Sequence, residues 1–222
     1  MVTAETSQAV QDYAKAIYSL SAREGSAVST SELAERLGVS AASASAMVKR
    51  LDSLGLVEHE RYHGVRLTDA GEKVALEVLR HHRLLELYLA EALGMPWDRV
   101  HAEAEVLEHV ISEELEELIA AKLGNPSIDP HGDPIPSREL KIEEGDTLAL
   151  QSLEPGTRGR FVRVSDSDPE MLRYLSERGI SPGERFEVME KQPFEGPVSV
   201  RFGKREHVLG GKLARAMRAD VS

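Results

Sequence analysis

Apolar residues recur every three to four positions over residues 9–20, and this spacing predicts an amphipathic helix. A second, short helix is expected over residues 32–37, with Thr30 or Ser31 as its N-terminal cap and Gly38 at its end. Each helix has one apolar face that can be buried against a neighbour.

Ser40 can cap a third helix that runs from Ala41 to about Leu54. Because only Gly-Val-Ser separates it from the helix before, the pair predicts a helix-turn-helix. The side chains expected to be buried are Ala44, Met47, Val48, Leu51 and Leu54. Those expected to face outward are Ser40, Ala42, Ser43, Ser45, Ala46, Lys49 and Arg50. Small outward side chains let a helix enter a DNA major groove closely, and hydroxyl and basic groups can then reach phosphates or base edges.

Residues 56–68 predict two short strands around a Tyr-His-Gly turn, and the hairpin carries Arg61, His63 and Arg66, which suit contact with a DNA backbone. With the helix-turn-helix, this hairpin predicts a winged helix. The DNA-contacting residues are then expected to be Ser40, Ala42, Ser43, Ser45, Lys49, Arg50, Arg61 and His63. A winged helix used only for protein contact is the alternative.

Three longer helices are expected to begin near Thr68, Trp97 and Ser112. Their apolar stripes can form the core of a dimer through Val106, Leu107, Val110, Leu115, Leu118 and Ile119. A connection with four prolines follows, up to Gly145.

A compact β unit ends the chain. Short apolar segments begin at Thr147, Gly159, Arg185 and Val198, and a helical stretch begins at Met171. The expected fold class is therefore mostly α with a small β domain. It divides into a winged-helix DNA-binding domain (1–70), a helical metal-binding and dimerisation domain with its connecting loop (71–144), and a small β barrel (145–222).

The composition limits the cellular and chemical context. The 222 residues contain no cysteine, which excludes disulfides, thiolate metal sites and thiol redox switches. No run approaches the ~20 apolar residues that a membrane helix needs. The first residues lack the basic and apolar regions of a secretory signal, so a cytoplasmic protein is expected.

The net charge of −11 would argue against a nucleic-acid partner if it were evenly spread. Residues 71–144 carry 7 Lys and Arg against 17 Asp and Glu, whereas residues 1–70 carry 7 against 9 and residues 145–222 carry 13 against 12. The acidity is therefore local to the middle segment. This distribution fits a cation-binding core and leaves the first segment able to bind DNA.

The acidic middle segment also contains potential metal ligands at helical spacing. One stretch holds four of them: His101, Glu105, Glu108 and His109. On a helix these side chains would share one broad face. His82 and Glu86 form a similar pair on the preceding helix. Carboxylates with some imidazole and no thiolate favour Mn²⁺ or Fe²⁺ over structural zinc. A solvated acidic helix with stray histidines is the plainer interpretation of this segment.

Three motifs follow the winged helix: His-Arg-Leu-Leu-Glu from His82, Trp-Asp-Arg-Val-His-Ala-Glu-Ala-Glu-Val-Leu-Glu-His from Trp97, and Asp-Pro-His-Gly-Asp-Pro-Ile-Pro from Asp129. In this order the chain resembles the diphtheria-toxin-repressor family of metal-dependent transcriptional repressors, and most closely its manganese-responsive branch. The resemblance covers nearly the whole chain and implies an SH3-like barrel of the FeoA type for the β unit. It implies a homodimer that binds double-stranded operator DNA when Mn²⁺, or alternatively Fe²⁺, is bound, and that controls metal-uptake genes. Neither a membrane nor a small organic ligand is expected as a partner.

The same resemblance implies two metal sites. The primary site would use Asp12, Glu105, Glu108 and His109, with His82 as a further ligand in some members. The ancillary site would use Glu86, His131 and Asp168, with His82 or His101 as additional ligands. Iron-responsive relatives have Met and Cys in place of Asp12 and Glu105, so the carboxylates here favour the harder Mn²⁺. Binuclear manganese relatives have Glu one turn after Asp12, where this chain has Lys15, which argues against their paired-metal arrangement.

Without metal, the carboxylates of the primary site are expected to repel one another and leave the first helix loose. A divalent cation would pin this helix and restrict the spacing of the two DNA-reading heads of a dimer. A metalloenzyme is one alternative, because carboxylates and histidines around a cation can activate water. The sequence has no P-loop or Gly-x-Ser-x-Gly element, so no enzyme is expected. A winged-helix sensor of an organic ligand is a third interpretation.

Overall fold

The computed structural model describes residues 7–24, 26–60, 64–143, 145–166 and 168–221. It divides into two compact units. The first comprises residues 1–82, 106–116 and 136–141, and the second comprises residues 83–105, 117–135 and 142–222. Within the described ranges, none of the helices combines the length and the apolar character needed to cross a membrane.

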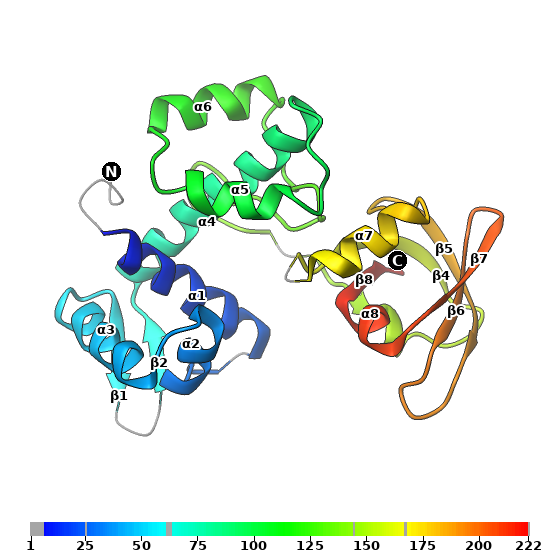
Figure 1. Cartoon of the computed structure of the whole chain (residues 1–222), viewed down its shortest axis with the longest axis horizontal. Coiled ribbons are helices and arrows are strands. Elements are labelled where there is room, and N and C mark those ends of the chain that lie inside the picture. The colour runs from blue at the N-terminus through cyan, green and yellow to red at the C-terminus, as the bar shows by residue number, and fades with distance from the viewer. Residues whose placement is uncertain (1–6, 25, 61–63, 144, 167, 222) are drawn as a thin grey trace. The chain divides into compact units, whose positions relative to one another are not determined.

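The first unit begins with three helices and a hairpin (Figure 1). These are α1 (Gln8–Glu24), α2 (Thr30–Leu37), α3 (Ala41–Ser53), β1 (Val57–Glu60) and β2 (Gly64–Leu67). The two strands pair antiparallel, and Val28 forms an isolated bridge with Val65 on the other side of β2. Helix α1 contacts α2, α3 and β2. The arrangement confirms the predicted winged helix.

The N-terminal cap of α2 is Ser29. Its hydroxyl accepts a hydrogen bond from the Glu32 backbone N–H at 3.2 Å, and the Glu32 carboxylate accepts one from the Ser29 N–H at 2.7 Å. The prediction of Thr30 or Ser31 as the cap was wrong, because only Ser29 stands three residues before the Glu that completes this reciprocal pair. Gly38 ends α2 in the left-handed conformation, with φ +64°.

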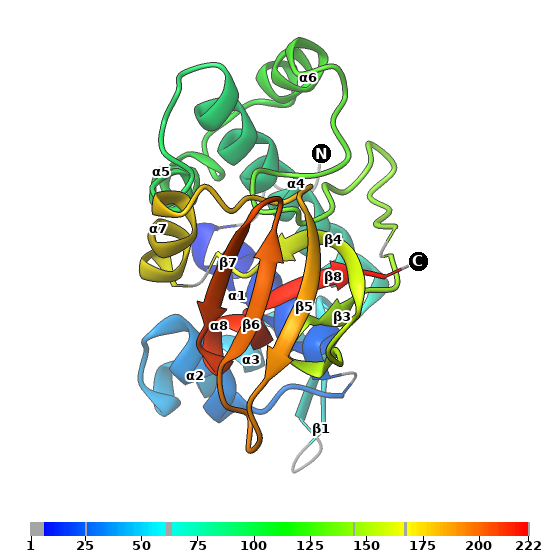
Figure 2. The same ribbon diagram turned by 90° about the vertical axis from the view of Figure 1, so that its right-hand side faces the viewer.

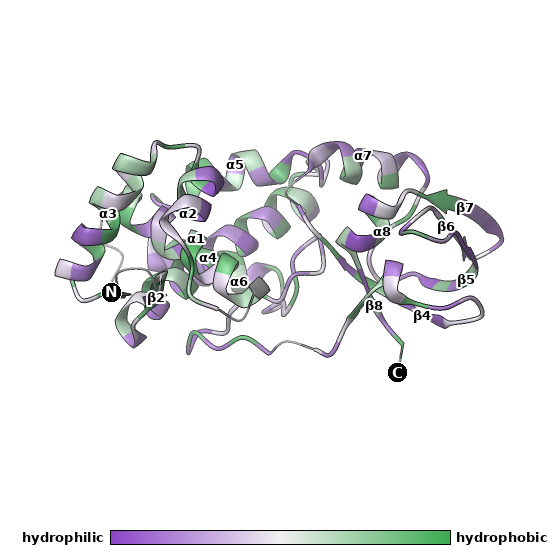
Figure 3. Ribbon diagram, turned by 90° about the horizontal axis from the view of Figure 1, so that it is seen from below, coloured by the Kyte–Doolittle hydropathy of each residue, from purple (hydrophilic) through white to green (hydrophobic). Residues whose placement is uncertain are grey.

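Helix α3 is capped by Ser40, as predicted, whose hydroxyl accepts from the Ser43 N–H at 3.1 Å. Apolar and polar positions both occur along the helix (Figure 3). Its buried residues are Ala44, Val48 and Leu51, and Met47 is partly buried. Leu54 is 52% exposed, so its predicted burial was wrong; it is the C-terminal cap of a helix that ends at Ser53.

Three further helices are α4 (Asp69–Glu91), α5 (Val100–Leu107) and α6 (Glu113–Lys122). Residues of α4 up to His82 belong to the first unit and the later ones to the second. At Gly71, a Cβ atom would lie 1.9 Å from the Leu56 carbonyl oxygen, so glycine is needed for the close approach of α4 to the segment after α3.

The second unit contains a six-stranded antiparallel sheet in the order β3-β8-β4-β5-β6-β7 (Figure 2). The strands are β3 (Leu148–Ala149), β4 (Arg158–Val164), β5 (Arg185–Lys191), β6 (Val198–Phe202), β7 (Arg205–Leu209) and β8 (Met217–Asp220). A 3₁₀ turn, η2 (Leu150–Ser152), and the helices α7 (Pro169–Glu177) and α8 (Gly211–Ala216) complete it. The sequence pattern predicted the strands up to β6 and the helix α7, but not β7, α8 or β8.

Alternate residues of β6 are buried, namely Val198, Val200 and Phe202. They belong to a core that includes Phe161 of β4 and Leu172 and Leu175 of α7. The chain is therefore mostly helical with a small antiparallel β domain at its C-terminal end, which confirms the predicted fold class.

Candidate metal centres and DNA-binding surface

Asp12, Glu108 and His109 bring three potential ligand atoms within 4.8 Å of one another in the first unit. Asp12 lies on α1, whereas Glu108 and His109 lie in the turn directly after α5. His109 Nε2 is 2.9 Å from Asp12 Oδ1 and 3.3 Å from Glu108 Oε1. Two carboxylates and one imidazole nitrogen thus converge from segments far apart in the sequence. We call this group the first centre.

The hydrogen bonding of His109 directs a nitrogen lone pair into the first centre. Its Nδ1–H donates to the side-chain oxygen of Gln11 at 2.6 Å. In the neutral ring Nε2 is then unprotonated, and it is buried without a hydrogen bond to any described residue. A lone pair that faces carboxylate oxygens is unfavourable unless a proton or a metal ion lies between them. The donor set therefore fits a divalent cation.

The Glu108 side chain is fully buried, and both of its oxygens have partners. His82 Nδ1 donates to Oε2 at 2.5 Å, and Lys15 Nζ donates to Oε1 at 2.6 Å. A buried carboxylate is costly unless it is paired in this way. His82 and Lys15 thus determine where the Glu108 carboxylate lies.

A second layer of contacts holds the turn that carries Glu108. The buried His81 places Nδ1 3.0 Å from the Glu108 carbonyl oxygen and Nε2 3.0 Å from Glu116 Oε2. Arg80 Nε donates to the other Glu116 oxygen at 2.5 Å. Burial raises the pKa of Glu116, but the bonds to His81 and Arg80 outweigh it, and the net pKa lies below the ordinary value.

The second unit contains another group of acids and imidazoles around Glu86, whose side chain is fully buried. Glu86, His101 and Asp166 form one set, and Glu86, Asp129 and His131 form another, each with ligand atoms within 4.8 Å. His101 Nδ1 is 3.1 Å from Glu86 Oε1 and 3.0 Å from Asp166 Oδ2. His131 Nδ1 is 3.6 Å from Glu86 Oε2. We call these five residues the second centre.

His131 repeats the arrangement of His109. Its Nε2–H donates to the Trp97 carbonyl oxygen at 2.9 Å, and the two rings stack with centroids 5.7 Å apart. Nδ1 is buried without a hydrogen bond among the described residues and faces Glu86. The Asp129 carboxylate accepts from the His131 backbone N–H at 2.8 Å and thereby orients the loop. A divalent cation that replaced a proton on Nδ1 would meet this nitrogen and the Glu86 carboxylate together, so the donor set fits a metal ion.

The carboxylates raise the proton affinity of both imidazoles in the second centre. Burial lowers the pKa of His101, but Asp166 and Glu86 raise it to about 10. Burial likewise lowers the pKa of His131, and Glu86 and Asp129 raise it to about 9. Burial raises the pKa of Asp129 well above its ordinary value. The group therefore holds positive charge as protons, which a metal ion would displace.

Relatives of known function identify the family. The description "iron dependent repressor, N-terminal DNA binding domain" matches residues 5–65, the metal-binding and dimerisation domain of the same family matches residues 68–137, and a FeoA domain matches residues 148–220. The iron-dependent repressor IdeR of Mycobacterium tuberculosis is 31% identical over 220 residues, which cover 94% of this chain and 95% of that protein. The chain belongs to the iron-dependent repressor family.

Solved structures agree with this membership. A manganese-dependent transcriptional repressor in complex with manganese is 43% identical, with a TM-score of 0.89 over 96% of this chain and all of that one. The manganese regulator SloR is 29% identical, with a TM-score of 0.78 over 96% of this chain and 98% of that one. The protein is therefore a metal-dependent transcriptional repressor with a DNA-binding domain and a dimerisation domain, and the metalloenzyme alternative is dropped.

In this repressor the predicted ligand Asp168 lies away from the second centre. It caps α7, where it accepts from the Glu170 N–H at 3.2 Å, and it pairs with Lys212 at 3.1 Å. The carboxylate that reaches His101 belongs to Asp166, two residues earlier. The structure thus brings Asp166 rather than Asp168 to His101, while the role of either carboxylate as a metal ligand remains a prediction.

The predicted single helical face over residues 101–109 also needs correction. Helix α5 ends at Leu107, so Glu108 and His109 lie in a turn. His101 joins the second centre, and its Nε2 is 3.7 Å from Glu105 Oε1. The side chain of Glu105 is 41% exposed, and its role as a ligand remains a prediction.

The repressor exposes most of the side chains predicted to contact DNA. Ser40, Ala42, Ser43, Lys49 and Arg50 are exposed, and Ser45 is partly buried. Ser40 and Ser43 share a hydrogen bond between their hydroxyls at 2.8 Å. The remaining two predicted contacts, Arg61 and His63, lie outside the described residues.

Sequence reasoning missed two residues of the second centre, Asp129 and Asp166, and two residues that hydrogen-bond to the first centre, Gln11 and His81. Gln11 stands beside Asp12 on a predicted amphipathic helix, but its burial, which marks it as a hydrogen-bonding residue, is visible only in the structure. Adjacent histidines on α4 gave a weaker signal for His81. Asp129 and Asp166 lie in loops, where no periodic spacing marks them.

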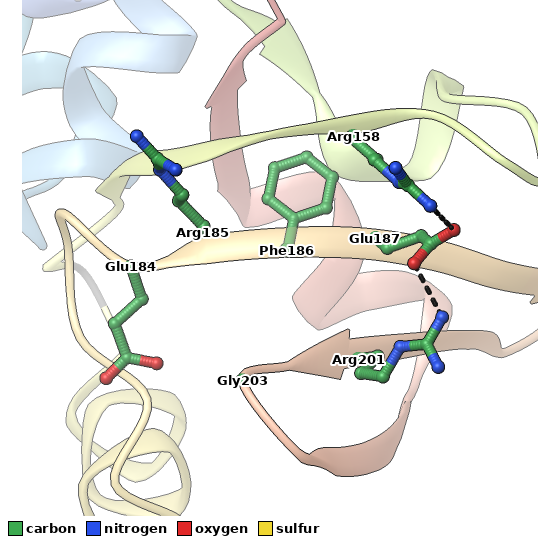
Figure 4. Close-up of a pocket in the computed structure, with 7 residues that line it drawn as sticks. All are labelled: Arg158, Glu184, Arg185, Phe186, Glu187, Arg201 and Gly203. Atoms are coloured by element: carbon green, nitrogen blue, oxygen red, sulfur yellow. Dashed lines mark hydrogen bonds and ion pairs between the residues drawn. The ribbon is translucent and has the colours of Figure 1, made fainter.

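The β domain of the repressor has a separate surface pocket lined by charged residues around Phe186 (Figure 4). Glu187 accepts hydrogen bonds from Arg158 at 3.0 Å and from Arg201 at 2.5 Å. These two guanidinium groups hold the pKa of Glu187 below its ordinary value. The charges largely satisfy one another, so the pocket provides no buried site for a metal.

Proposed function

We propose that this chain is a manganese-responsive repressor that binds double-stranded operator DNA as a homodimer. The observation that carries the proposal is the first centre, in which Asp12 of α1 meets Glu108 and His109 through oxygen and nitrogen atoms alone. A chain without cysteine has no thiolate to offer, and a carboxylate-rich site suits a hard ion such as Mn²⁺. The 43% identity to a manganese-dependent repressor supports the choice of metal.

The first centre would control DNA binding through α1. Asp12 belongs to α1, whereas Glu108 and His109 belong to the turn after α5. The first centre therefore links α1 to that turn. A bound divalent cation supplies positive charge that offsets the repulsion between the carboxylates. Because α1 contacts α2 and α3, its position affects the predicted DNA-reading helix. Typical couplings of about 1–3 kcal/mol would change operator affinity by about 5–150-fold.

The second centre would serve as the ancillary site, with Glu86, His101, His131 and Asp166 as ligands and Asp129 orienting the loop. The fit rests on the buried Nδ1 of His131, which faces Glu86, and on the two carboxylates beside His101. The division of the chain at residues 70 and 144 and the contribution of Glu105 to the first centre remain predictions.

The dimer would bury apolar side chains around α5 and α6. Val106 is 68% exposed, Val110 is 74% exposed and Leu115 is 45% exposed in the first unit, and Leu118 is 61% exposed in the second. Exposed apolar side chains in each unit favour protein interfaces. Ile119 is 5% exposed and belongs instead to the interior of the chain. Residence in the cytoplasm and control of metal-uptake genes complete the proposal.

The test is a titration of Mn²⁺, Fe²⁺ and Zn²⁺ against a fluorescent library of genomic fragments. We expect tight binding to a small set of fragments with Mn²⁺ and its loss on addition of EDTA. Equal binding with and without chelator would refute a metal-dependent repressor and favour a sensor of another ligand.

An iron-dependent repressor is the second candidate. The observation that favours it is the 31% identity to an iron-dependent repressor over 94% of the chain. In the same titration this candidate requires Fe²⁺, under anaerobic conditions, to restore binding at lower free concentration than Mn²⁺.

A further inference from the structure

A lysine side chain lies beside the first centre and supplies a positive charge there. Lys15 lies one turn after Asp12 on α1, and its Nζ donates to Glu108 Oε1 at 2.6 Å. Only 14% of the Lys15 side chain is exposed, and none of the Glu108 side chain. Enclosure reduces the screening by water, so this ion pair is worth more than one on the surface.

Lys15 and a metal ion would use the same carboxylate oxygen. Glu108 Oε1 is the atom that Lys15 holds, and it is also the atom 3.3 Å from His109 Nε2. The other oxygen, Oε2, is engaged by His82 at 2.5 Å. A cation that binds between Asp12, Glu108 and His109 must therefore compete with the ammonium group or share Oε1 with it.

The net charge of the first centre also argues that it binds few cations. Asp12 and Glu108 together carry two negative charges, and the ammonium of Lys15 leaves one. A single divalent ion then leaves one positive charge on these side chains, which the Glu105 carboxylate would offset if it also binds, and a second ion would add two more at a centre whose Asp12 side chain is 32% exposed. Like charges a few ångströms apart repel strongly when water is excluded.

We propose that Lys15 is a positioning residue, a tethered cation that holds α1 against the Glu108 turn in the metal-free protein and weakens the binding of divalent metal there. This inference rests on the proposed function. It revises the expectation that the metal-free carboxylates leave α1 loose, because Lys15 offsets part of their repulsion. The residue sets how much metal is needed before the site fills, and it limits the first centre to one ion.

The test compares Lys15→Met and Lys15→Arg with Lys73→Met, whose lysine is exposed on α4. The full chain is stripped of metal, and its melting temperature is measured by calorimetry. Free Mn²⁺ is then followed by electron paramagnetic resonance during titration. Asp12→Ala identifies which binding event belongs to the first centre.

In Lys15→Met we expect the metal-free melting temperature to fall by about 3 °C or more. The affinity of the Asp12-dependent event should rise about tenfold or more, because the repulsion and the competition for Oε1 are both removed. Lys15→Arg restores the charge and should return both values toward wild type. Lys73→Met should change neither.

A Lys15→Met substitution that merely damaged the site would weaken Mn²⁺ binding, whereas the proposed role predicts tighter binding. The direction of the change in Mn²⁺ affinity therefore separates the two explanations. Unchanged or weaker Mn²⁺ binding in Lys15→Met would overturn the inference while the proposed function stands. If the wild-type chain shows no Asp12-dependent Mn²⁺ binding, the proposed function itself fails.

Discussion

Gly132→Ala tests whether close backbone approach holds the loop that carries His131. Gly132 has φ +88°, and a Cβ atom there would lie 1.8 Å from the Val162 carbonyl oxygen and 2.8 Å from its carbon. Ordinary contacts of a Cβ atom begin at 3.4 Å. The loop must therefore move by more than an ångström, because the obstacle is the backbone of β4 and cannot rotate away.

The loss of stability can be worked from two contributions. The left-handed conformation costs alanine about 1–2 kcal/mol. Movement of the loop also weakens the hydrogen bond from the Val164 N–H to the His131 carbonyl oxygen at 3.0 Å, which contributes about 0.5–1.5 kcal/mol. We expect the free energy of unfolding to fall by about 2–4 kcal/mol, with the remainder coming from lost packing. The same movement displaces His131 Nδ1 from Glu86.

Urea unfolding of the metal-free protein measures the stability, and mass spectrometry of the dialysed protein measures the bound Mn²⁺. Gly124→Ala is the matched control, since Gly124 has φ +76° but nothing within 4 Å of its Cβ position. The control should lose only about 1–2 kcal/mol and keep its metal. The reasoning is refuted if Gly132→Ala is no less stable than Gly124→Ala and binds as much metal.

Three further predictions concern single side chains. Asp12→Ala or Glu105→Ala should abolish metal-dependent operator binding with an unchanged circular dichroism spectrum; a normal Mn²⁺ response in either variant contradicts its assignment as a ligand. Arg50→Ala should weaken DNA binding by about tenfold without moving the calorimetric Mn²⁺ isotherm, and a shifted isotherm would count against a role in DNA contact alone. Glu116→Gln should cost about 1–3 kcal/mol of unfolding free energy at pH 7. The folded pKa of Glu116 lies below its ordinary value of 4.5. The stability that its carboxylate contributes is therefore fully present above pH 4.5 and is lost as the pH falls through the folded pKa. A stability difference between Glu116→Gln and wild type that stays constant from pH 7 to pH 3 in urea unfolding would contradict this.

The winged helix was predictable because local rules determine most of it. Helical spacing, the Ser40 cap and the left-handed Gly38 mark the elements in sequence alone. The cap of α2 was misplaced within Ser29-Thr30-Ser31 because all three residues have a hydroxyl group. Only the position of Glu32, three residues after Ser29, selects among them.

The end of the chain was harder to predict. Strand β7 has the sequence Arg-Glu-His-Val-Leu, in which only Leu209 is buried, so its apolar alternation is faint. It stands at the end of the sheet, next to β6, and as an edge strand it can be polar. Strand β8 directly follows α8, and four residues are too few to show a period.

The two centres depend on burial, which spacing does not reveal. Glu86, Glu108 and His131 look like solvated residues of an acidic segment, yet their side chains are fully buried. A buried carboxylate must have a positive partner, and the chain supplies part of that charge itself, as the ammonium of Lys15 at the first centre and as protons on imidazoles at the second. A metal ion must displace these cations or share their carboxylate ligands. The metal concentration at which such a repressor responds therefore depends on the positive charge already present as well as on the ligands. Lys15 is not itself a ligand, and its substitution should change this concentration while the ligand set stays the same.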